Sequence, residues 1–247
     1  MSKILILPDI HGRDFWKDAV NKEEYDEIVF LGDYVDPYPD EFRGLNPTQL
    51  TDNTISNLHE IIEWAKDKSN VTFLLGNHDL HYINQTFYDY AGGTRYNRRY
   101  DKEINDFYNE MKDKIKICRI FEDNGKKFIL SHSGVTRFWY NQTKELIGDF
   151  NEENVNKLLD SYDGMVALAM VGRIRGGFAL RGSIVWADLR EHIFENDEKD
   201  ENPMKKYFQI FAHTRLQSKP FITDTFACID VGKPFVLDNG ELKEINM

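Results

Sequence analysis

Short apolar segments alternate with polar ones at the start of the chain. Residues 4–7, 28–31 and 71–75 are rich in Ile, Val, Leu and Phe, which predicts three buried strands. Phe15 and Val20 belong to a short helical pattern that follows the first of these segments. Strands that alternate with helices indicate βαβ units. We therefore expect a sheet with parallel pairing in this half of the chain.

The longest helix is expected to begin at Pro47. Asn46 is a suitable cap, Pro is favoured in a first turn, and apolar residues recur at helical spacing from Ile55 to Ala65. Further along, residues 115–120 and 127–131 predict a hairpin, with Asn124 and Gly125 as its turn. The second half of the chain thus begins with an antiparallel pair.

The remaining pattern is less regular. Residues 151–171 have helical spacing that breaks near residues 163–164. Further strands are expected at the following apolar segments: residues 183–187, 207–212, 226–231 and 234–237. No linker interrupts the chain, so we interpret residues 1–247 as a single domain with one sizeable core.

Composition narrows the class of protein. Acidic residues outnumber basic ones by 42 to 31, a formal charge of -11 that disfavours broad nucleic-acid binding. Bound cations would still allow an anionic substrate. No apolar run is long enough for a membrane span or a secretory signal. Cys118 and Cys228 have no partner at metal-ligand spacing, which favours free thiols and a cytoplasmic protein.

Polar segments follow the expected strands in five places. They contain carboxylate, imidazole and amide groups, and they lie at residues 9–11, 32–36, 76–79, 131–134 and 212–214. Open α/β sheets form their sites at such strand ends, because the loops there converge. Oxygen and nitrogen donors without thiolate suit Mn²⁺, Fe or Zn²⁺. The pattern therefore predicts a metal site.

These segments resemble the motifs of the calcineurin-like metallophosphoesterases. Gly-Asp-Tyr-Val-Asp at 32–36 and Gly-Asn-His-Asp at 76–79 are similar to signatures of the serine/threonine phosphoprotein phosphatase branch, and Trp186-Ala-Asp188 resembles its Trp-Ser-Asp stretch. The resemblance implies an α/β (α+β) fold, a four-layer sandwich of two mixed β-sheets flanked by helices. It also implies a dinuclear metal centre at the strand ends.

The same resemblance implies the ligands. Asp9, His11 and Asp33 would hold the first ion, and Asp33, Asn77, His132 and His213 would hold the second. Two divalent or trivalent ions are expected, Mn²⁺ first, with Fe or Zn²⁺ as alternatives. Many members have His-x-His at the last motif, but here Arg215 takes the place of the second histidine.

His78 and Asp36 are the expected catalytic pair. His78 directly follows the ligand Asn77, so it can face the site as a general acid while Asp36 orients its ring. The related phosphatases have an arginine after Asp36 that grips phosphate, and this chain has Pro37. We favour Arg175 and Arg190 as replacements. Arg43, Arg95, Arg98, Arg99, Arg173 and Arg181 are further candidates, and a solvated surface residue is the alternative for each.

The expected activity is hydrolysis of phosphate monoesters, on a phosphoprotein or a small phosphate ester. A hydroxide shared by the two ions would attack phosphorus directly. Hydrolysis of a dinucleoside polyphosphate or a phosphodiester is the alternative, and a non-catalytic scaffold or a DNA-end nuclease fits the sequence less well. His81, three residues beyond His78, could approach the site, but a helix-start or loop histidine is favoured, and His192 is given no function. The expected partner is the phosphorylated substrate, with neither membrane nor nucleic acid.

Overall fold

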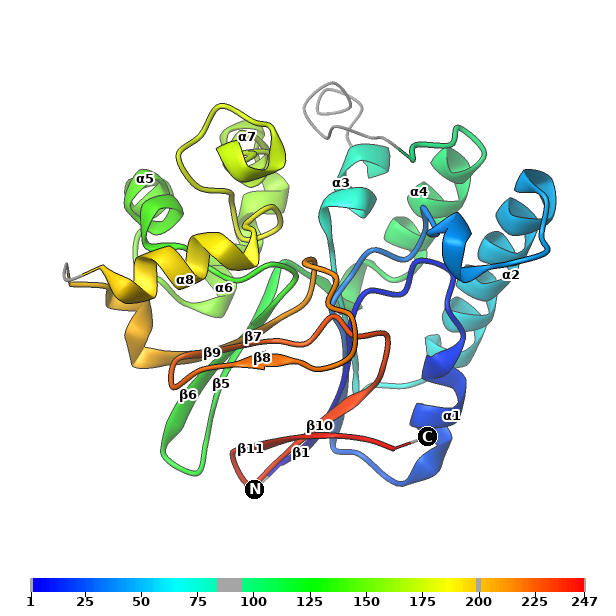
Figure 1. Ribbon diagram of the computed structural model, residues 1–247, viewed down its shortest axis with the longest axis horizontal. Helices are drawn as coiled ribbons and strands as arrows, with labels where there is room; N and C mark the ends of the chain where they lie inside the picture. Colours follow the sequence, from blue (N-terminus) through cyan, green and yellow to red (C-terminus); the bar gives the residue numbers. More distant parts are fainter. Residues whose placement is uncertain (1, 84–94, 199–200, 247) are drawn as a thin grey trace.

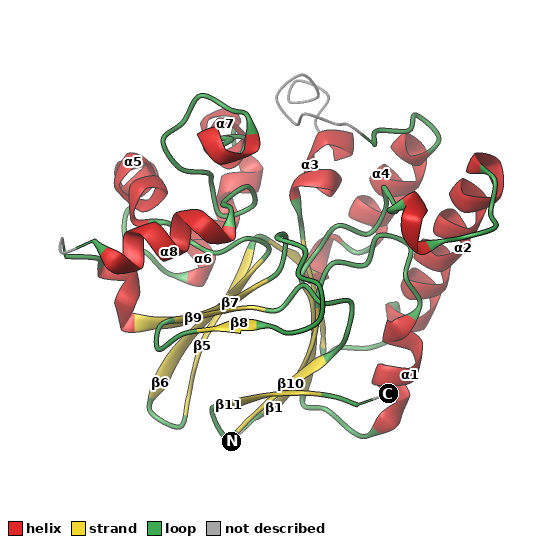
Figure 2. Ribbon diagram, viewed as in Figure 1, coloured by secondary structure: helices red, strands yellow, loops and turns green. Residues whose placement is uncertain are grey.

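Two mixed β-sheets face each other and helices cover their outer sides (Figure 1). The computed structural model describes residues 2–83, 95–198 and 201–246. Helices, sheet, sheet and helices follow one another across the molecule (Figure 2). This arrangement confirms the α/β sandwich expected from the sequence.

The first sheet has the order β11-β10-β1-β2-β3-β4. Its strands are β1 (Lys3–Leu7), β2 (Glu27–Phe30), β3 (Val71–Leu74), β4 (Ile115–Lys116), β10 (Phe235–Asp238) and β11 (Glu241–Glu244). Strands β1 to β4 pair in parallel, and β10 pairs antiparallel with both of its neighbours. The loops that follow β1, β2 and β3 therefore leave the sheet at one edge.

The second sheet has the order β5-β6-β7-β9-β8. Its strands are β5 (Cys118–Asp123), β6 (Lys126–Ser131), β7 (Tyr207–Phe211), β8 (Phe221–Ile222) and β9 (Phe226–Cys228). The predicted β5–β6 hairpin is present, and it closes at Asn124 and Gly125, which have φ of 49° and 74°. Strands β6, β7 and β9 are parallel, so their loops also share one edge.

The helices divide between the two outer faces. The longer ones are α1 (Phe15–Lys22), α2 (Pro47–Ala65), α3 (Asn77–Ile83), α4 (Tyr100–Glu110), α5 (Arg137–Ile147), α6 (Glu152–Asn156), α7 (Tyr162–Leu168) and α8 (Leu189–Asp197). Short 3-10 turns occur at Pro39–Glu41, Lys112–Lys114, Lys157–Asp160, Arg173–Arg175 and Pro203–Lys206. Figure 1 shows α1, α2 and α4 beside the first sheet and α5 to α8 beside the second.

The start of α2 agrees with its sequence signal. Asn46 Oδ1 accepts from the backbone N–H of Gln49 at 3.0 Å, and Gln49 Oε1 accepts from the backbone N–H of Asn46 at 3.0 Å. This reciprocal capping box satisfies two donors that the first turn leaves free. The sequence therefore located this helix start correctly.

Alternating side chains of β1 serve two different cores. Ile4 and Ile6 point toward the second sheet and pack with residues such as Leu130. Leu5 and Leu7 point the other way, toward the helices. All four are fully buried, and each such side chain contributes about 1.5–3 kcal/mol by leaving water. The strand is thus apolar throughout because both of its faces are covered.

Two predicted strands differ from the structure. Residues 115–120 form β4 and the start of β5, which belong to different sheets. The chain changes sheet at Ile117, where Asn156 Oδ1 accepts from the backbone N–H groups of Ile117 and Cys118 at 2.7 and 3.1 Å. Residues 183–187 are not a strand, because the backbone N–H groups of Trp186 and Ala187 turn back to Ser183 O.

The predicted helical break near residues 163–164 is also displaced. Helix α7 runs through Gly164, and the interruption lies at Ser161, whose side chain caps α7. A Cβ at position 164 would lie 2.2 Å from Leu158 O. Gly164 therefore allows close packing inside a helix and does not end it.

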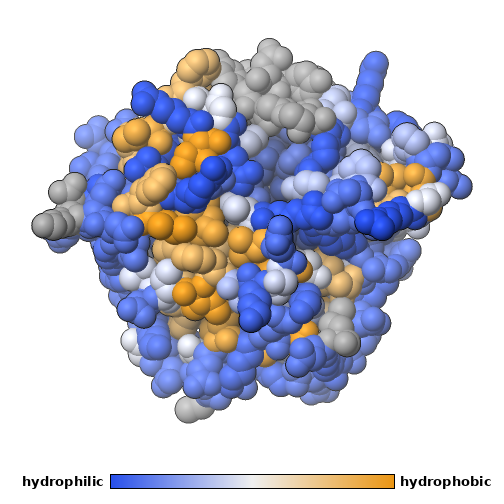
Figure 3. All heavy atoms as spheres, in the orientation of Figure 1, coloured by the Kyte–Doolittle hydropathy of each residue, from blue (hydrophilic) through white to orange (hydrophobic). Residues whose placement is uncertain are grey.

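Exposed apolar side chains gather on the side of the molecule formed by α7, α8 and the loop between them (Figure 3). They are Tyr162, Val166, Phe178, Leu180 and Phe194, of which Phe178 is 93% exposed. Within the described part of the chain, no helix has both the length and the apolar character that a membrane crossing requires.

Candidate metal centre

The loops of both sheets meet at one edge and bring six polar side chains together. Asp9 and His11 follow β1, Asp33 follows β2, Asn77 begins α3 after β3, His132 follows β6, and His213 follows β7. Each of them is 6% exposed or less. The structure therefore places all the residues expected as metal ligands in the interior of this edge.

The first cluster consists of Asp9, His11 and Asp33. His11 Nε2 lies 3.4 Å from Asp33 Oδ2 and 3.8 Å from Asp9 Oδ2. His11 Nδ1–H donates to Val35 O at 2.7 Å, so in the neutral ring Nε2 carries the lone pair. Burial, followed by the charges of His78 and Arg95, lowers the pKa of His11 and favours its neutral form. Three donor atoms thus face one point.

The second cluster consists of Asp33, Asn77, His132 and His213. His132 Nε2 lies 3.0 Å from Asn77 Oδ1, 3.0 Å from His213 Nδ1 and 3.4 Å from Asp33 Oδ2. His132 Nδ1–H donates to Leu31 O at 2.8 Å, which again leaves Nε2 as the lone-pair nitrogen. Burial lowers the pKa of His132 to about 3. Asp33 belongs to both clusters.

These donors fit metal ions better than they fit each other. Asp9 Oδ2 is buried without a hydrogen-bond partner, and lone pairs of His11 and His132 face carboxylate oxygens. Burial, and then the nearby carboxylates, raise the pKa values of Asp9 and Asp33. Buried acceptors that face each other cost free energy unless a cation lies between them. Within the described residues, both Asp9-His11-Asp33 and Asp33-His132-His213 are close enough to hold an ion.

The backbone at the site is held in an uncommon conformation. His11, Asp33, Asp36 and His213 have φ of 44°, 52°, 57° and 62°, the left-handed region that L-residues rarely adopt. Such strain persists where the surroundings over-determine it, and it concentrates at functional sites. Close packing adds to the constraint, because a Cβ at Gly76 would lie 2.1 Å from Asp33 Oδ1. Only glycine fits there.

Asp79 links the loop after β2 to the loop after β3 by hydrogen bonds. Its carboxylate accepts from the backbone N–H groups of Asp33, Tyr34 and Gly76 at 2.8, 3.0 and 2.8 Å. Burial raises its pKa to about 7 although these hydrogen bonds oppose the shift. Asp79 was not among the residues predicted to act at the site. Its position in the Gly-Asn-His-Asp motif was the only signal.

His78 and Asp36 form the expected pair. His78 Nδ1–H donates to Asp36 Oδ2 at 2.7 Å, so the Nε2 atom of His78 is directed elsewhere. Asp36 Oδ1 accepts from Tyr82 at 2.5 Å. Burial would raise the pKa of Asp36, but these hydrogen bonds outweigh it and lower the pKa. The pKa of His78 is lowered as well, because burial disfavours its charged form, and the hydrogen bond to Asp36 opposes that shift.

His81 lies nearer to this pair than the sequence suggested. It is 1% exposed, and its Nε2 lies 3.3 Å from Asp36 Oδ2. Asp36, His78 and His81 are also close enough to hold an ion. The two hydrogen bonds that Asp36 accepts from His78 and Tyr82 already satisfy its oxygens, so we interpret Asp36 and Tyr82 as the support of His78. Both ring nitrogens of His81 are buried without a hydrogen-bond partner among the described residues.

The two arginines favoured from the sequence both pair with Asp188. Arg175 Nε lies 2.9 Å from Asp188 Oδ2, and Arg175 Nη2 donates to Thr214 Oγ1 at 2.9 Å, next to the candidate ligand His213. Arg190 Nε lies 2.7 Å from Asp188 Oδ1, and its side chain is 62% exposed. Arg175 therefore borders the second cluster, whereas Arg190 lies at the surface.

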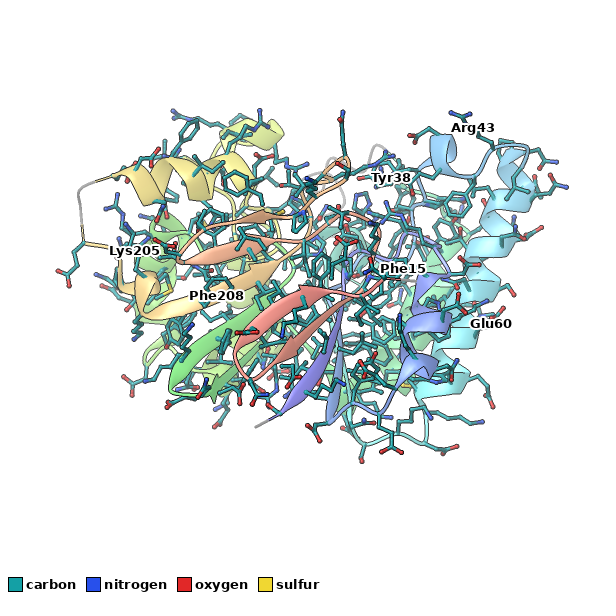
Figure 4. The ribbon with its side chains drawn as sticks, turned by 60° about the horizontal axis from the view of Figure 1, so that its bottom comes forward. Phe15, Tyr38, Arg43, Glu60, Lys205 and Phe208 are labelled. Atoms are coloured by element: carbon teal, nitrogen blue, oxygen red, sulfur yellow. The ribbon has the colours of Figure 1, made fainter. Side chains whose placement is uncertain are left out.

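Arg95 is the arginine nearest to the first cluster. Its Nη2 lies 3.3 Å from His78 Nε2 and 3.5 Å from His11 Nε2. Its guanidinium carbon lies 3.6 Å from the ring centroid of Tyr38. Figure 4 shows Tyr38 on the loop after β2, whereas Arg43, farther along the same loop, points outward at the edge of the molecule. Arg95 was one of several candidates from the sequence, and Tyr38 was not singled out.

Comparison with known proteins agrees with this geometry. The family model of the calcineurin-like phosphoesterases matches residues 2–165. The chain belongs to this family. The matched residues include Asp9, His11, Asp33, Asn77 and His132, so the family match covers most of both clusters. The family typically binds divalent metal ions and hydrolyses phosphate esters, and the two clusters provide residues that could hold the metal.

A hypothetical protein from Pyrococcus horikoshii OT3 has a similar solved structure, with 12% sequence identity and a TM-score of 0.49. The alignment covers 99% of this chain and 87% of that one. No curated protein sequence matches the chain at a significant level.

Proposed function

We propose that this calcineurin-like phosphoesterase is a phosphatase that hydrolyses phosphate monoesters. A phosphoprotein or a small phosphate ester is the proposed substrate, and the serine/threonine phosphoprotein phosphatase branch is its proposed relative. The observation that carries the proposal is the pair of buried donor clusters that share Asp33, with His78 beside them. We also propose a cytoplasmic location, because Cys118 and Cys228 are buried free thiols.

The proposed ligands divide as the two clusters do. Asp9, His11 and Asp33 would hold the first ion, and Asp33, Asn77, His132 and His213 would hold the second. Mn²⁺ is the proposed ion, with Fe or Zn²⁺ as alternatives that the same donors accept. Ions bound there would supply a hydroxide near neutral pH and neutralise charge on the phosphate oxygens.

His78 is the proposed proton donor to the leaving oxygen. Its Nδ1–H is occupied by Asp36 Oδ2 at 2.7 Å, so the proton for the leaving oxygen would come from Nε2, which without substrate faces the donor Nη2 of Arg95 at 3.3 Å. Asp36, fixed in turn by Tyr82, keeps the ring in one orientation. A positioned acid of this kind accelerates the departure of a poor leaving group by about 100- to 10,000-fold.

The test is a hydrolysis assay on chelator-treated protein to which single cations are returned. p-Nitrophenyl phosphate and bis-p-nitrophenyl phosphate report monoesterase and diesterase activity, and phosphopeptides and dinucleoside polyphosphates extend the panel. We expect activity only with added ions and a kcat/KM for the monoester at least about 10 times that for the diester. A tenfold preference for the diester would instead make the chain a phosphodiesterase, and no activity with any ion would contradict the proposal.

A further inference from the structure

We propose that Arg95 binds the phosphoryl group of the substrate, with Tyr38 as the residue that positions it. The inference rests on the proposed phosphatase function and deepens it. Arg95 would take the role of the phosphate-binding arginine expected after Asp36, where this chain has Pro37. The replacement comes from a different segment, which follows α3 in the chain.

The location of the guanidinium is the first argument. Nη2 of Arg95 lies within hydrogen-bond distance of His78 Nε2, at 3.3 Å, and of His11 Nε2, at 3.5 Å. The rings of His11 and His78 are 5.2 Å apart. A phosphoryl group must lie between the first metal cluster and the proton donor to the leaving oxygen. Arg95 reaches that place in the described structure.

The charge of Arg95 is the second argument. Arg13, Arg175, Arg190 and Arg215 each form an ion pair with a carboxylate. Among the described residues, no carboxylate lies within ion-pair distance of Arg95, and its Nε atom is buried without a hydrogen-bond partner. A partly buried cation beside a metal site is unfavourable unless an anion balances it. A phosphate dianion is the anion that the proposed reaction brings there.

The contact with Tyr38 is the third argument. A guanidinium carbon 3.6 Å from the ring centroid indicates a stacked cation–π contact. Tyr38 in turn meets the ring of His11 edge-on, with centroids 4.9 Å apart. This packing limits the orientation of the planar guanidinium, whose parallel N–H groups suit two phosphate oxygens. We therefore infer that Tyr38 acts on the substrate by positioning Arg95.

Three variants test Arg95. Arg95→Ala removes the guanidinium group, and Arg95→Lys keeps the charge without the planar group. Arg99→Ala is the matched control, because Arg99 lies in the same segment and donates to Asp52 at 2.5 Å on the surface of α2. Isothermal titration measures the binding of inorganic phosphate to Mn²⁺-loaded protein, and a separate titration measures Mn²⁺ itself. Turnover of p-nitrophenyl phosphate supplies KM and kcat.

For Arg95→Ala we expect phosphate binding and kcat/KM to fall about 10- to 100-fold while the number of bound Mn²⁺ ions stays unchanged. Arg95→Lys should lie between Arg95→Ala and the wild type, and Arg99→Ala within about twofold of the wild type. Phosphate binding by Arg95→Ala within about threefold of the wild type would overturn the proposal. Loss of Mn²⁺ from Arg95→Ala would overturn it as well, because it would indicate a structural role.

Tyr38 is tested by a conservative pair. Tyr38→Phe keeps the aromatic face, so we expect phosphate binding within about threefold of the wild type; Tyr38→Leu removes the face and should weaken it about 3- to 10-fold. Equal effects of the two changes would contradict the positioning role. Failure of the phosphatase proposal looks different: wild-type protein would bind phosphate through Arg95 and hydrolyse no monoester.

Discussion

The two metal clusters share Asp33 but differ in how the fold assembles them. The first cluster comes from the loops after β1 and β2, neighbouring strands of one sheet. The second joins Asp33 and Asn77 of that sheet to His132 and His213 of the facing sheet. The first therefore depends on local loop structure, whereas the second also depends on how the two sheets pack.

Hydrogen bonds of the two clusters reflect this difference. Between the neighbouring loops, the backbone N–H of His11 donates to Asp33 O at 2.6 Å. Between the sheets, His132 Nδ1–H donates to Leu31 O at 2.8 Å, and the backbone N–H of His213 donates to Asp9 Oδ1 at 3.2 Å. Candidate ligands thus also contribute to the contact between the sheets. Ions bound to them are expected to strengthen that contact.

The largest effect is expected from Asp33→Asn, because this residue belongs to both clusters. Loss of its charge should reduce the binding of both ions and lower kcat/KM by more than about 100-fold, beyond the range typical of residues that only support a ligand. Metal analysis after gel filtration and the monoester assay measure the two effects. A variant that retained two ions and most of its activity would show that Asp33 does not bridge them.

A matched pair of variants separates the clusters. His11→Ala should remove an ion from the first cluster alone, and His132→Ala an ion from the second alone, each with a loss of activity of about 100-fold. His132→Ala should also lose more of the metal-induced increase in melting temperature, because His132 links the two sheets. Calorimetry with and without Mn²⁺ measures this. Equal loss in the two variants would argue against the structural difference between the clusters.

His78→Asn should affect chemistry and leave both clusters filled. With phenyl phosphate, whose leaving group is poor, kcat should fall about 100-fold, and with p-nitrophenyl phosphate, which needs less protonation, it should fall less. A plot of log kcat against leaving-group pKa measures the difference as a steeper slope. An unchanged slope would remove His78 from the role of acid.

The smallest loss is expected from Gly76→Ala, because it removes no ligand. Its new methyl group would contact a ligand of each cluster. The new Cβ would lie 2.1 Å from Asp33 Oδ1 and 2.8 Å from His132 Cε1. We expect a loss of about 1–3 kcal/mol in the free energy of unfolding, together with weaker Mn²⁺ binding. Gly44→Ala is the control: φ is +89° there and no atom lies within 4 Å, so it strains the backbone without touching a ligand. Equal Mn²⁺ affinity of the two variants would contradict the expectation.

Much of this arrangement was predictable because it depends on local signals. The strands β1 to β3 are short apolar runs that end directly in polar motifs, and Asn46 caps α2 through a neighbour three residues away. Parallel pairing then brings the motifs to one edge. The sequence pattern therefore indicated both the fold and the group of residues that the structure brings together.

Contacts between distant segments could not be predicted in the same way. The chain leaves one sheet for the other at Ile117, where Asn156 Oδ1 accepts a hydrogen bond from the backbone N–H of Ile117. Arg95 reaches the site by stacking on Tyr38, and neither residue lies in a periodic pattern. Arg190, favoured from its place in the chain, lies at the surface, where it pairs with the buried Asp188. Tertiary packing decided each of these cases.

Anomalous diffraction from crystals grown with Mn²⁺ is the most direct test of the central claim. We expect two peaks on either side of Asp33, one beside Asp9 and His11 and the other beside Asn77, His132 and His213. The dinuclear centre would be contradicted by a single peak, by peaks away from Asp33, or by none at saturating Mn²⁺.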